Sequence, residues 1–221
     1  MLFFGHIGIT TGLVKVSQNL VVGRKSGYSE NYLKPHYGKA QIRQYILLDG
    51  IRNKIKSIDY RFVLIGSLLP DIIDKPMWFF TSNNFAWAGR GYAHTFLFNL
   101  LLLIGGLILV TRWSKTWLIT IALCGFIHLV FDQMWLNTTT LWWPLLGPIP
   151  REATVGWLTS MVQGLISNPY VYISETVGFI ITLYIALRLI ISRRVRHFLK
   201  TGDIELSKSL PNKETNETES N

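Results

Sequence analysis

Residues 95–131 read TFLFNLLLLIGGLILVTRWSKTWLITIALCGFIHLVF, and this stretch decides the fold. The runs 95–111 and 116–131 contain no Asp, Glu, Lys or Arg, and the short basic turn RWSK separates them. Each run approaches the roughly 20 apolar residues that a helix needs to cross a bilayer. The stretch therefore predicts an antiparallel pair of membrane-spanning helices.

The composition of the whole chain fits this interpretation. The 221 residues are 49% hydrophobic and 16% charged, with a mean hydropathy of +0.27, whereas soluble domains carry about 25% charged residues. The net charge is +9, and the basic residues fall between the apolar stretches. This placement favours contact with the anionic headgroups of membrane lipids. We expect membrane lipids as partners and no direct binding of nucleic acid.

Three further segments are apolar enough to join the pair. Residues 170–187 form a third strong run with one ionisable side chain (Asp, Glu, Lys, Arg or His), whereas 62–80, with three, and 1–23, with two, are weaker. Pro70 and Pro76 are expected to kink or end a helix in the second of these. We predict an all-α fold, a polytopic integral membrane helical bundle of about four to five transmembrane segments.

Basic residues predict the topology of this bundle. The segments 24–61, 112–115 and 193–197 are basic, the first with nine Lys/Arg against three Asp/Glu, so the positive-inside rule places all three in the cytoplasm. Alternation then places the N-terminus and the connections 81–93 and 137–169 outside.

The same pattern divides the chain into two parts. Residues 1–199 are expected to form one membrane-embedded domain. Residues 200–221 end in NKETNETESN, a polar composition typical of a disordered tail, here on the cytoplasmic side.

His128 and Asp132 are unexpected inside an apolar run. Their spacing of four places both on one face of a helix, and an ionisable residue inside a membrane usually serves a function. Two interpretations are equally weighted for this pair alone: metal ligands, or a hydrogen bond that ties helices together.

A second polar cluster lies in GSLLPDIID, residues 66–74. Asp71 and Asp74 would repel each other unless one stays protonated, and a divalent cation would keep both ionised. The alternatives are that the carboxylates cap the helix after Pro70 or pair with Lys75.

Two more histidines open apolar segments. His94 follows Arg90 in GRGYAHTF, and His6 lies in GHIGITTG. A lone histidine at a helix start is more often a hydrogen-bonding residue at the membrane surface. The predicted topology, however, places both at the same depth as the other polar residues, in the outer half of the membrane.

Taken together, the six residues predict a metal site. Histidine nitrogen and carboxylate oxygen suit zinc, with manganese or iron as alternatives. The candidate ligands are His6, Asp71, Asp74, His94, His128 and Asp132.

The motifs GSLLPDIID, GRGYAHTF and GFIHLVFDQ, in this order, resemble those of the YdjM-like family of membrane-bound metal-dependent hydrolases. The family pattern runs P-D-x-D-H, R-G-x-T-H-S and H-x-x-x-D, and the resemblance covers residues 1 to about 150. It implies a multi-pass protein of the plasma (inner) membrane of a prokaryote.

The chain departs from that pattern at several positions. One extra residue separates the aspartates, Lys75 stands where the family usually has histidine, and Ala93 and Thr95 replace threonine and serine. These differences leave open which aspartate binds metal, and Asp71 is favoured because its proline–aspartate pair matches the family motif directly. The order of motifs is also similar to that of the zinc-dependent phospholipase C and nuclease group, whose further downstream ligands are missing here unless Glu175 supplies one. One or two metals are therefore expected, not three.

The leading hypothesis is a metal-dependent hydrolase. A metal held by Asp71 or Asp74 with the other ligands would lower the pKa of bound water toward neutrality, for attack on an ester or phosphoester of a lipid or lipid-linked substrate. Asp74 is the candidate general base and Arg90 the candidate anchor for an anionic group. Alternatives are an ion or proton transporter with an intramembrane His/Asp relay, and a non-catalytic scaffold whose metal is structural.

Overall fold

The computed structural model describes residues 2–22, 58–80, 89–150 and 157–204, with a few isolated positions between 41 and 55. Within these ranges the chain is helical and contains no strand among its elements. The all-α prediction is thus confirmed for the described part of the chain. Most of the basic segment 24–61, part of the connection 81–93 and residues 205–221 of the predicted tail lie outside the described residues.

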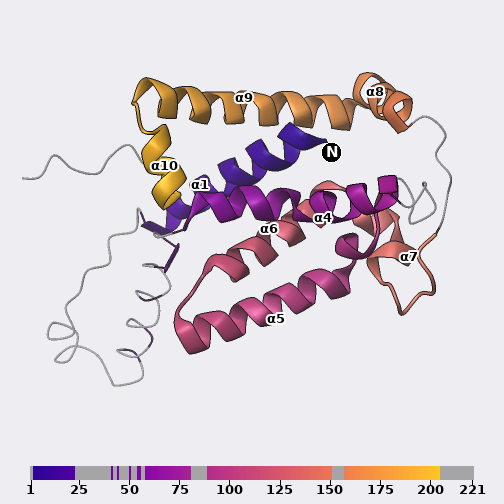
Figure 1. Ribbon diagram of the computed structural model, residues 1–221, viewed down its shortest axis with the longest axis horizontal. Helices are drawn as coiled ribbons and strands as arrows, with labels where there is room; N and C mark the ends of the chain where they lie inside the picture. Colours follow the sequence, from indigo (N-terminus) through magenta and orange to yellow (C-terminus); the bar gives the residue numbers. More distant parts are fainter. Residues whose placement is uncertain are drawn as a thin grey trace, which may run out of the picture.

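All five predicted apolar segments form long helices (Figure 1). Shorter helices and turns connect or extend them. In chain order the elements are η1 (Gly5–Ile9), α1 (Thr10–Val22), α4 (Tyr60–Phe80), η2 (Tyr92–His94), α5 (Phe96–Trp113), α6 (Trp117–Phe131), η3 (Met134–Leu136), α7 (Thr138–Leu141), α8 (Trp157–Ser167), α9 (Pro169–Ile191) and α10 (Val195–Thr201).

Two of these helices, α5 and α9, are long and apolar enough to cross a membrane. Their surfaces are largely exposed to the surroundings, as at Leu101 (59% exposed) and Ile191 (79%), which is the expected exterior of a helix in contact with lipid. Helix α6 is equally apolar but shorter. The structure therefore supports membrane insertion through α5 and α9, whereas four to five spans remain a prediction.

Glycines bring the helices into close contact. Helix α6 packs between α4 and α5, and the N-terminal helix lies between α4 and α9 (Figure 1). A Cβ atom at Gly66 would lie 2.7 Å from the Cα of Ile121, and one at Gly106 would lie 2.7 Å from the Cα of Ile119. Small residues of this kind let helix backbones approach each other in a membrane. They fix the positions of α4 and α5 on either side of α6.

Helix α4 differs from the sequence prediction, because it continues through both Pro70 and Pro76. A proline inside a helix crowds the carbonyls of the preceding turn and removes one hydrogen bond. The carbonyl that loses its partner at Pro70 is that of Gly66, and the carbonyl of the next residue, Ser67, accepts a hydrogen bond from His128 Nδ1 at 2.7 Å. A neighbouring helix thus supplies a donor within the turn that Pro70 disrupts, and such donors are one means by which proline is tolerated in membrane helices.

The C-terminal end of the described chain folds back onto the start of α4. The backbone N–H of Tyr60 donates to the carbonyl of Gly202 at 2.9 Å, and the Arg61 side chain donates to the carbonyls of Leu199 and Lys200. Ile204 packs against the small core around Tyr60. The helical domain thus includes the first residues of the segment 200–221 that was predicted as tail.

Candidate metal centre

The structure brings all six predicted ligands into one buried cluster. They come from four elements that are distant in the sequence: η1, the second half of α4, η2, and the end of α6. Solvent reaches at most 8% of any of them, and the residues are His6, Asp71, Asp74, His94, His128 and Asp132. Two groups of three have ligand atoms within 4.8 Å of one another and could hold a metal ion: Asp71, His94 and His128, and His6, His128 and Asp132.

The first group has three ligand atoms that face one another. His94 Nε2 lies 3.2 Å from His128 Nε2 and 3.5 Å from Asp71 Oδ1, and His128 Nε2 lies 3.9 Å from the same oxygen. The far nitrogens of both rings are engaged elsewhere, because His128 Nδ1 contacts the Ser67 carbonyl and His94 Nδ1 contacts Asp74. These acceptors fix the proton on each Nδ1, so both Nε2 atoms present lone pairs to the cluster.

Two neutral imidazoles in this arrangement repel each other. Lone pairs 3.2 Å apart require a cation or a proton between them. A metal ion satisfies both Nε2 atoms and Asp71 together. The alternative to a metal ion is an additional proton on one Nε2, which would form a hydrogen bond within the histidine pair only.

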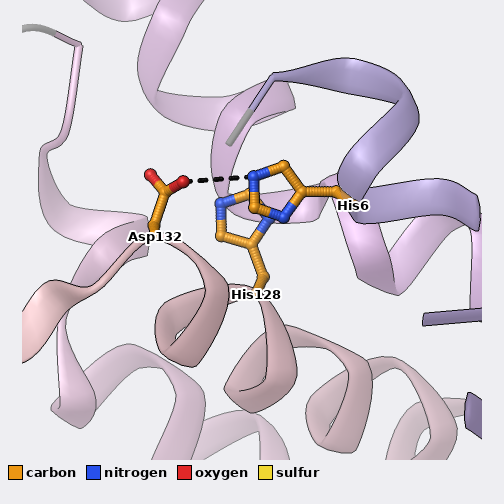
Figure 2. Close-up of side chains that lie close together, drawn as sticks. All are labelled: His6, His128 and Asp132. Carbon is orange, nitrogen blue, oxygen red and sulfur yellow. Dashed lines mark hydrogen bonds and ion pairs between the residues drawn. The ribbon is translucent and has the colours of Figure 1, made fainter. Parts of the chain in front are cut away.

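His6 extends the cluster on the side of Asp132. Figure 2 shows the His6 ring lying flat on the His128 ring while its Nε2 points to Asp132. The ring centroids are 3.9 Å apart, and Nε2 lies 3.1 Å from Asp132 Oδ1. Donation from Nε2 to this carboxylate leaves Nδ1 with a lone pair, and Nδ1 is buried without a hydrogen-bond partner among the described residues. A buried nitrogen acceptor of this kind is available to a cation.

Asp74 has a different position from the other carboxylates. Its two oxygens accept hydrogen bonds from the backbone N–H groups of Gly91, Ala93 and His94 at 2.8–3.1 Å, and from His94 Nδ1 at 2.7 Å. It therefore lies behind His94 and holds the loop that carries this ring. The geometry does not favour Asp74 as a metal ligand or general base, because its oxygens are occupied in orienting the His94 ring, as carboxylates behind metal-binding histidines do.

Two cations neutralise part of the cluster. Lys75 Nζ contacts Asp71 Oδ2 at 2.6 Å, and Arg90 Nε contacts Asp132 Oδ2 at 2.8 Å. Three carboxylates, counting Asp74, against these two cations leave one negative charge in excess when the histidines are neutral. Lys75 replaces the histidine of the family pattern, and its ammonium group pairs with the second oxygen of Asp71.

A pocket of about 360 Å³ opens beside Asp132 and Arg90. Its other walls come from the turn after α6 and from the first turn of α9. The lining residues include Gln133, Asn137, Asn168 and Tyr170, with Phe131, Leu136 and Val171 as apolar walls. Arg90 is about one-quarter exposed, so its guanidinium lies between the buried cluster and this opening.

The N-terminal turn that carries His6 is held by Glu175 of α9. The Glu175 carboxylate accepts hydrogen bonds from the backbone N–H groups of Leu2, Phe4 and Gly5 at 2.7–3.0 Å. It satisfies donors that a helix start leaves open, so it is not a further metal ligand. The sequence interpretation missed this role, although an acidic residue inside an apolar run is itself a signal.

Backbone contact between glycines completes the support of His6. A Cβ atom at Gly8 would overlap the carbonyl of Gly178, and one at Gly178 would overlap the carbonyl of Phe4. His6 also lies within a π-helical turn, η1, a local geometry that often occurs at functional sites. Together, Glu175 and the glycine contact determine how far His6 reaches into the cluster.

Comparison with known families identifies a match over most of the chain. Residues 36–197 match the family described as YdjM inner membrane protein. The matched range includes five of the six clustered residues but begins after His6, so the role of His6 rests on the structure alone. No curated protein and no solved structure matches the chain.

Proposed function

Because the chain belongs to the YdjM inner membrane protein family, we propose that its buried cluster is the site of a membrane-bound metal-dependent hydrolase. The observation that carries the proposal is the convergence of His94 Nε2, His128 Nε2 and Asp71 Oδ1 without a donor between them. Such a group has the composition and the charge of a cation site.

The distances between donor atoms support a small divalent ion. Zinc bonds of about 2.0–2.2 Å place neighbouring donors of a tetrahedral site about 3.3–3.6 Å apart. The separations of 3.2, 3.5 and 3.9 Å within the first group are close to this value, and Asp132 Oδ2 lies 3.8 Å from His94 Nε2. We infer that Asp71, His94, His128 and Asp132 hold one ion, with His6 beside them.

The donor set indicates which ions fit. Two or three imidazoles with carboxylates suit zinc best, with manganese and iron as alternatives. When bound, the ion supplies the Lewis acidity that makes water a nucleophile near neutral pH. The excess negative charge of the cluster would offset part of the charge of the cation.

The protein residues around the ion have distinct tasks. Asp74 orients His94, and the Ser67 carbonyl orients His128, so both rings are presented in one tautomer. Asp132 contacts both His6 and Arg90, which places its carboxylate between the cluster and the pocket. His6 Nδ1, which has a lone pair and no hydrogen-bond partner in the described part of the chain, is the proposed acceptor for a proton released in the reaction.

Substrate class follows from the pocket and its surroundings. Arg90 at the pocket wall would bind an anionic group such as a phosphoester or carboxylate. Large apolar side chains near the opening are exposed, for example Trp135 (51%) and Leu136 (70%). An ester or phosphoester of a lipid or lipid-linked molecule would match both features, because its tail remains in the membrane while its polar group reaches Arg90.

The test begins with metal content and then measures turnover. Protein purified in detergent is analysed for bound metal, treated with chelator, and assayed with and without added zinc against carboxylic esters, phosphodiesters and phospholipids. His128→Ala is the site variant, and His197→Ala, an exposed histidine of α10, is the matched control. We expect hydrolysis that needs zinc, persists in the control and is lost in the site variant.

Other outcomes assign the cluster to the alternative functions. Stoichiometric metal with no turnover on the whole panel would indicate a structural metal that connects α4, η2 and α6. Absence of metal together with proton flux in proteoliposomes, lost in His128→Ala, would indicate a relay through the hydrogen-bonded His/Asp groups. Either result refutes the hydrolase.

A further inference from the structure

A second cavity lies between α1 and α9, away from the buried cluster of His and Asp residues. Its volume is about 460 Å³, and its walls are mainly apolar, including Ile9, Leu13, Val16 and Ile181. Leu13 and Val16 are about half exposed, so the cavity is a groove on the outside of the helical bundle. Hydrocarbon is the natural filling of an apolar groove in a membrane protein, because it removes this surface from contact with polar groups.

Two cations line the same groove at one end. Lys15 of α1 and Arg188 of α9 are both among its lining residues. Helices α1 and α9 run in the same direction, because Gly8 contacts Gly178 and the next turn, at Gly12, faces Ile181. At 1.5 Å per residue, Lys15 lies about 10 Å along α1 from the glycine contact and Arg188 about 15 Å along α9. Both cations therefore lie at the end away from the cluster.

More positive charge follows at that end. Helix α9 ends at Ile191, and the basic stretch SRRVR, residues 192–196, follows it directly. Long basic side chains keep their charged groups at the membrane surface while their stems line apolar walls. The groove thus has an apolar body and a cationic mouth, which is the complement of a phospholipid with an anionic headgroup.

We propose that this groove binds an anionic phospholipid. One acyl chain lies between α1 and α9, and the phosphate-bearing headgroup contacts Lys15 and Arg188. The proposal does not depend on the hydrolase, because the groove lies on the other side of the glycine contact from His6. Phosphatidylglycerol is the appropriate probe, since its headgroup is anionic, and phosphatidylcholine with the same acyl chains is the neutral comparison.

The experiment titrates each lipid onto the detergent-purified protein and counts bound lipid by native mass spectrometry. A basic residue near a membrane surface favours anionic lipid by about fivefold, so the two cations together predict a preference of roughly 30-fold for phosphatidylglycerol. The double variant K15Q/R188Q should reduce this preference to a few-fold. The matched control R112Q/K115Q changes two basic residues of the exposed α5–α6 turn and should retain it.

A third variant tests the groove itself. A Cβ atom at Gly12 would lie 3.4 Å from Ile181 Cδ1, so Gly12→Leu extends into the groove without striking backbone. It should weaken both lipids. Equal affinity of the native protein for the two lipids would overturn the proposal, as would an equal loss of preference in the control.

Two further results would also refute lipid binding at this site. One is unchanged binding of both lipids in Gly12→Leu. The other is a stable dimer that binds neither lipid, which would assign the groove to a second copy of the chain. If the double variant does not fold, the single variants Lys15→Gln and Arg188→Gln decide the question, each with an expected fivefold loss.

Discussion

The variant Asp74→Asn tests whether Asp74 orients His94 rather than binding metal itself. The Asp74 carboxylate accepts four hydrogen bonds, three from backbone N–H groups of residues 91–94 and one from the His94 ring. Asparagine is almost the same size but has a single acceptor oxygen. Oδ2 accepts three of the four bonds and Oδ1 accepts one, from the backbone N–H of Ala93. With the asparagine oxygen in the position of Oδ2, the amide NH2 group faces the Ala93 N–H, so one bond is lost and two donors are brought together.

The expected loss is large for a single-atom change. A hydrogen bond to a charged acceptor contributes about 1.5–3 kcal/mol, so the lost bond alone costs about that much in the free energy of unfolding. Freed from its carboxylate, the His94 ring would no longer be held in one tautomer and orientation. Loss of such an outer partner lowers metal affinity by about 10- to 100-fold.

Asp71→Asn provides the contrast, because Asp71 directs Oδ1 at both Nε2 atoms. This variant should lose metal more completely while the metal-free protein keeps most of its stability. Asp59→Asn is the control: Asp59 pairs with Arg61 in a partly exposed ion pair at the start of α4. It should cost less than about 1 kcal/mol and leave metal binding unchanged.

The assay needs two readouts on each protein: zinc affinity by chelator competition, and thermal unfolding of the metal-free protein in detergent. The reasoning is refuted if metal-free Asp74→Asn unfolds at the native temperature. It is also refuted if Asp71→Asn retains native affinity for zinc while Asp74→Asn loses it, because the two aspartates would then have exchanged roles.

Three further predictions concern the cluster, its support and its orientation. His128→Ala and Asp132→Ala should each lose bound metal, measured as metal per chain; native stoichiometry in both folded variants would contradict the site. Gly8→Val should lower metal affinity and thermal stability together, because its side chain would strike the backbone of α9 and displace η1; metal affinity equal to that of the native protein would show that the N-terminal turn is not needed. A cysteine at Leu145 should react with an impermeant thiol reagent on intact cells and a cysteine at Lys115 should not, because the basic turn is expected in the cytoplasm; the reverse labelling would invert the topology and place the cluster at the inner face.

The long apolar segments could be predicted because their information is local. A run such as 95–111 carries its own preference for a helix in lipid, whatever lies next to it. The candidate ligands were also visible in the sequence, since His and Asp are costly inside an apolar run. In contrast, Pro70 was expected to kink or end the helix, and α4 continues through it, with His128 of a neighbouring helix donating to a carbonyl of the preceding turn.

The sequence by itself determined the five long apolar helices and the identity of the six clustered residues, because hydrophobicity and charge are properties of single residues. Only the tertiary structure decided their tasks. Asp71 and Asp74 are three positions apart, about 60° around a helix, so spacing alone allows both to reach one ion. The backbone N–H groups of residues 91–94 engage Asp74 and leave Asp71 facing the histidines. The different roles of Asp71 and Asp74 depend on contacts with a loop 17 to 20 positions later in the chain. No local sequence pattern predicts these contacts, so the roles can be assigned only from the folded structure.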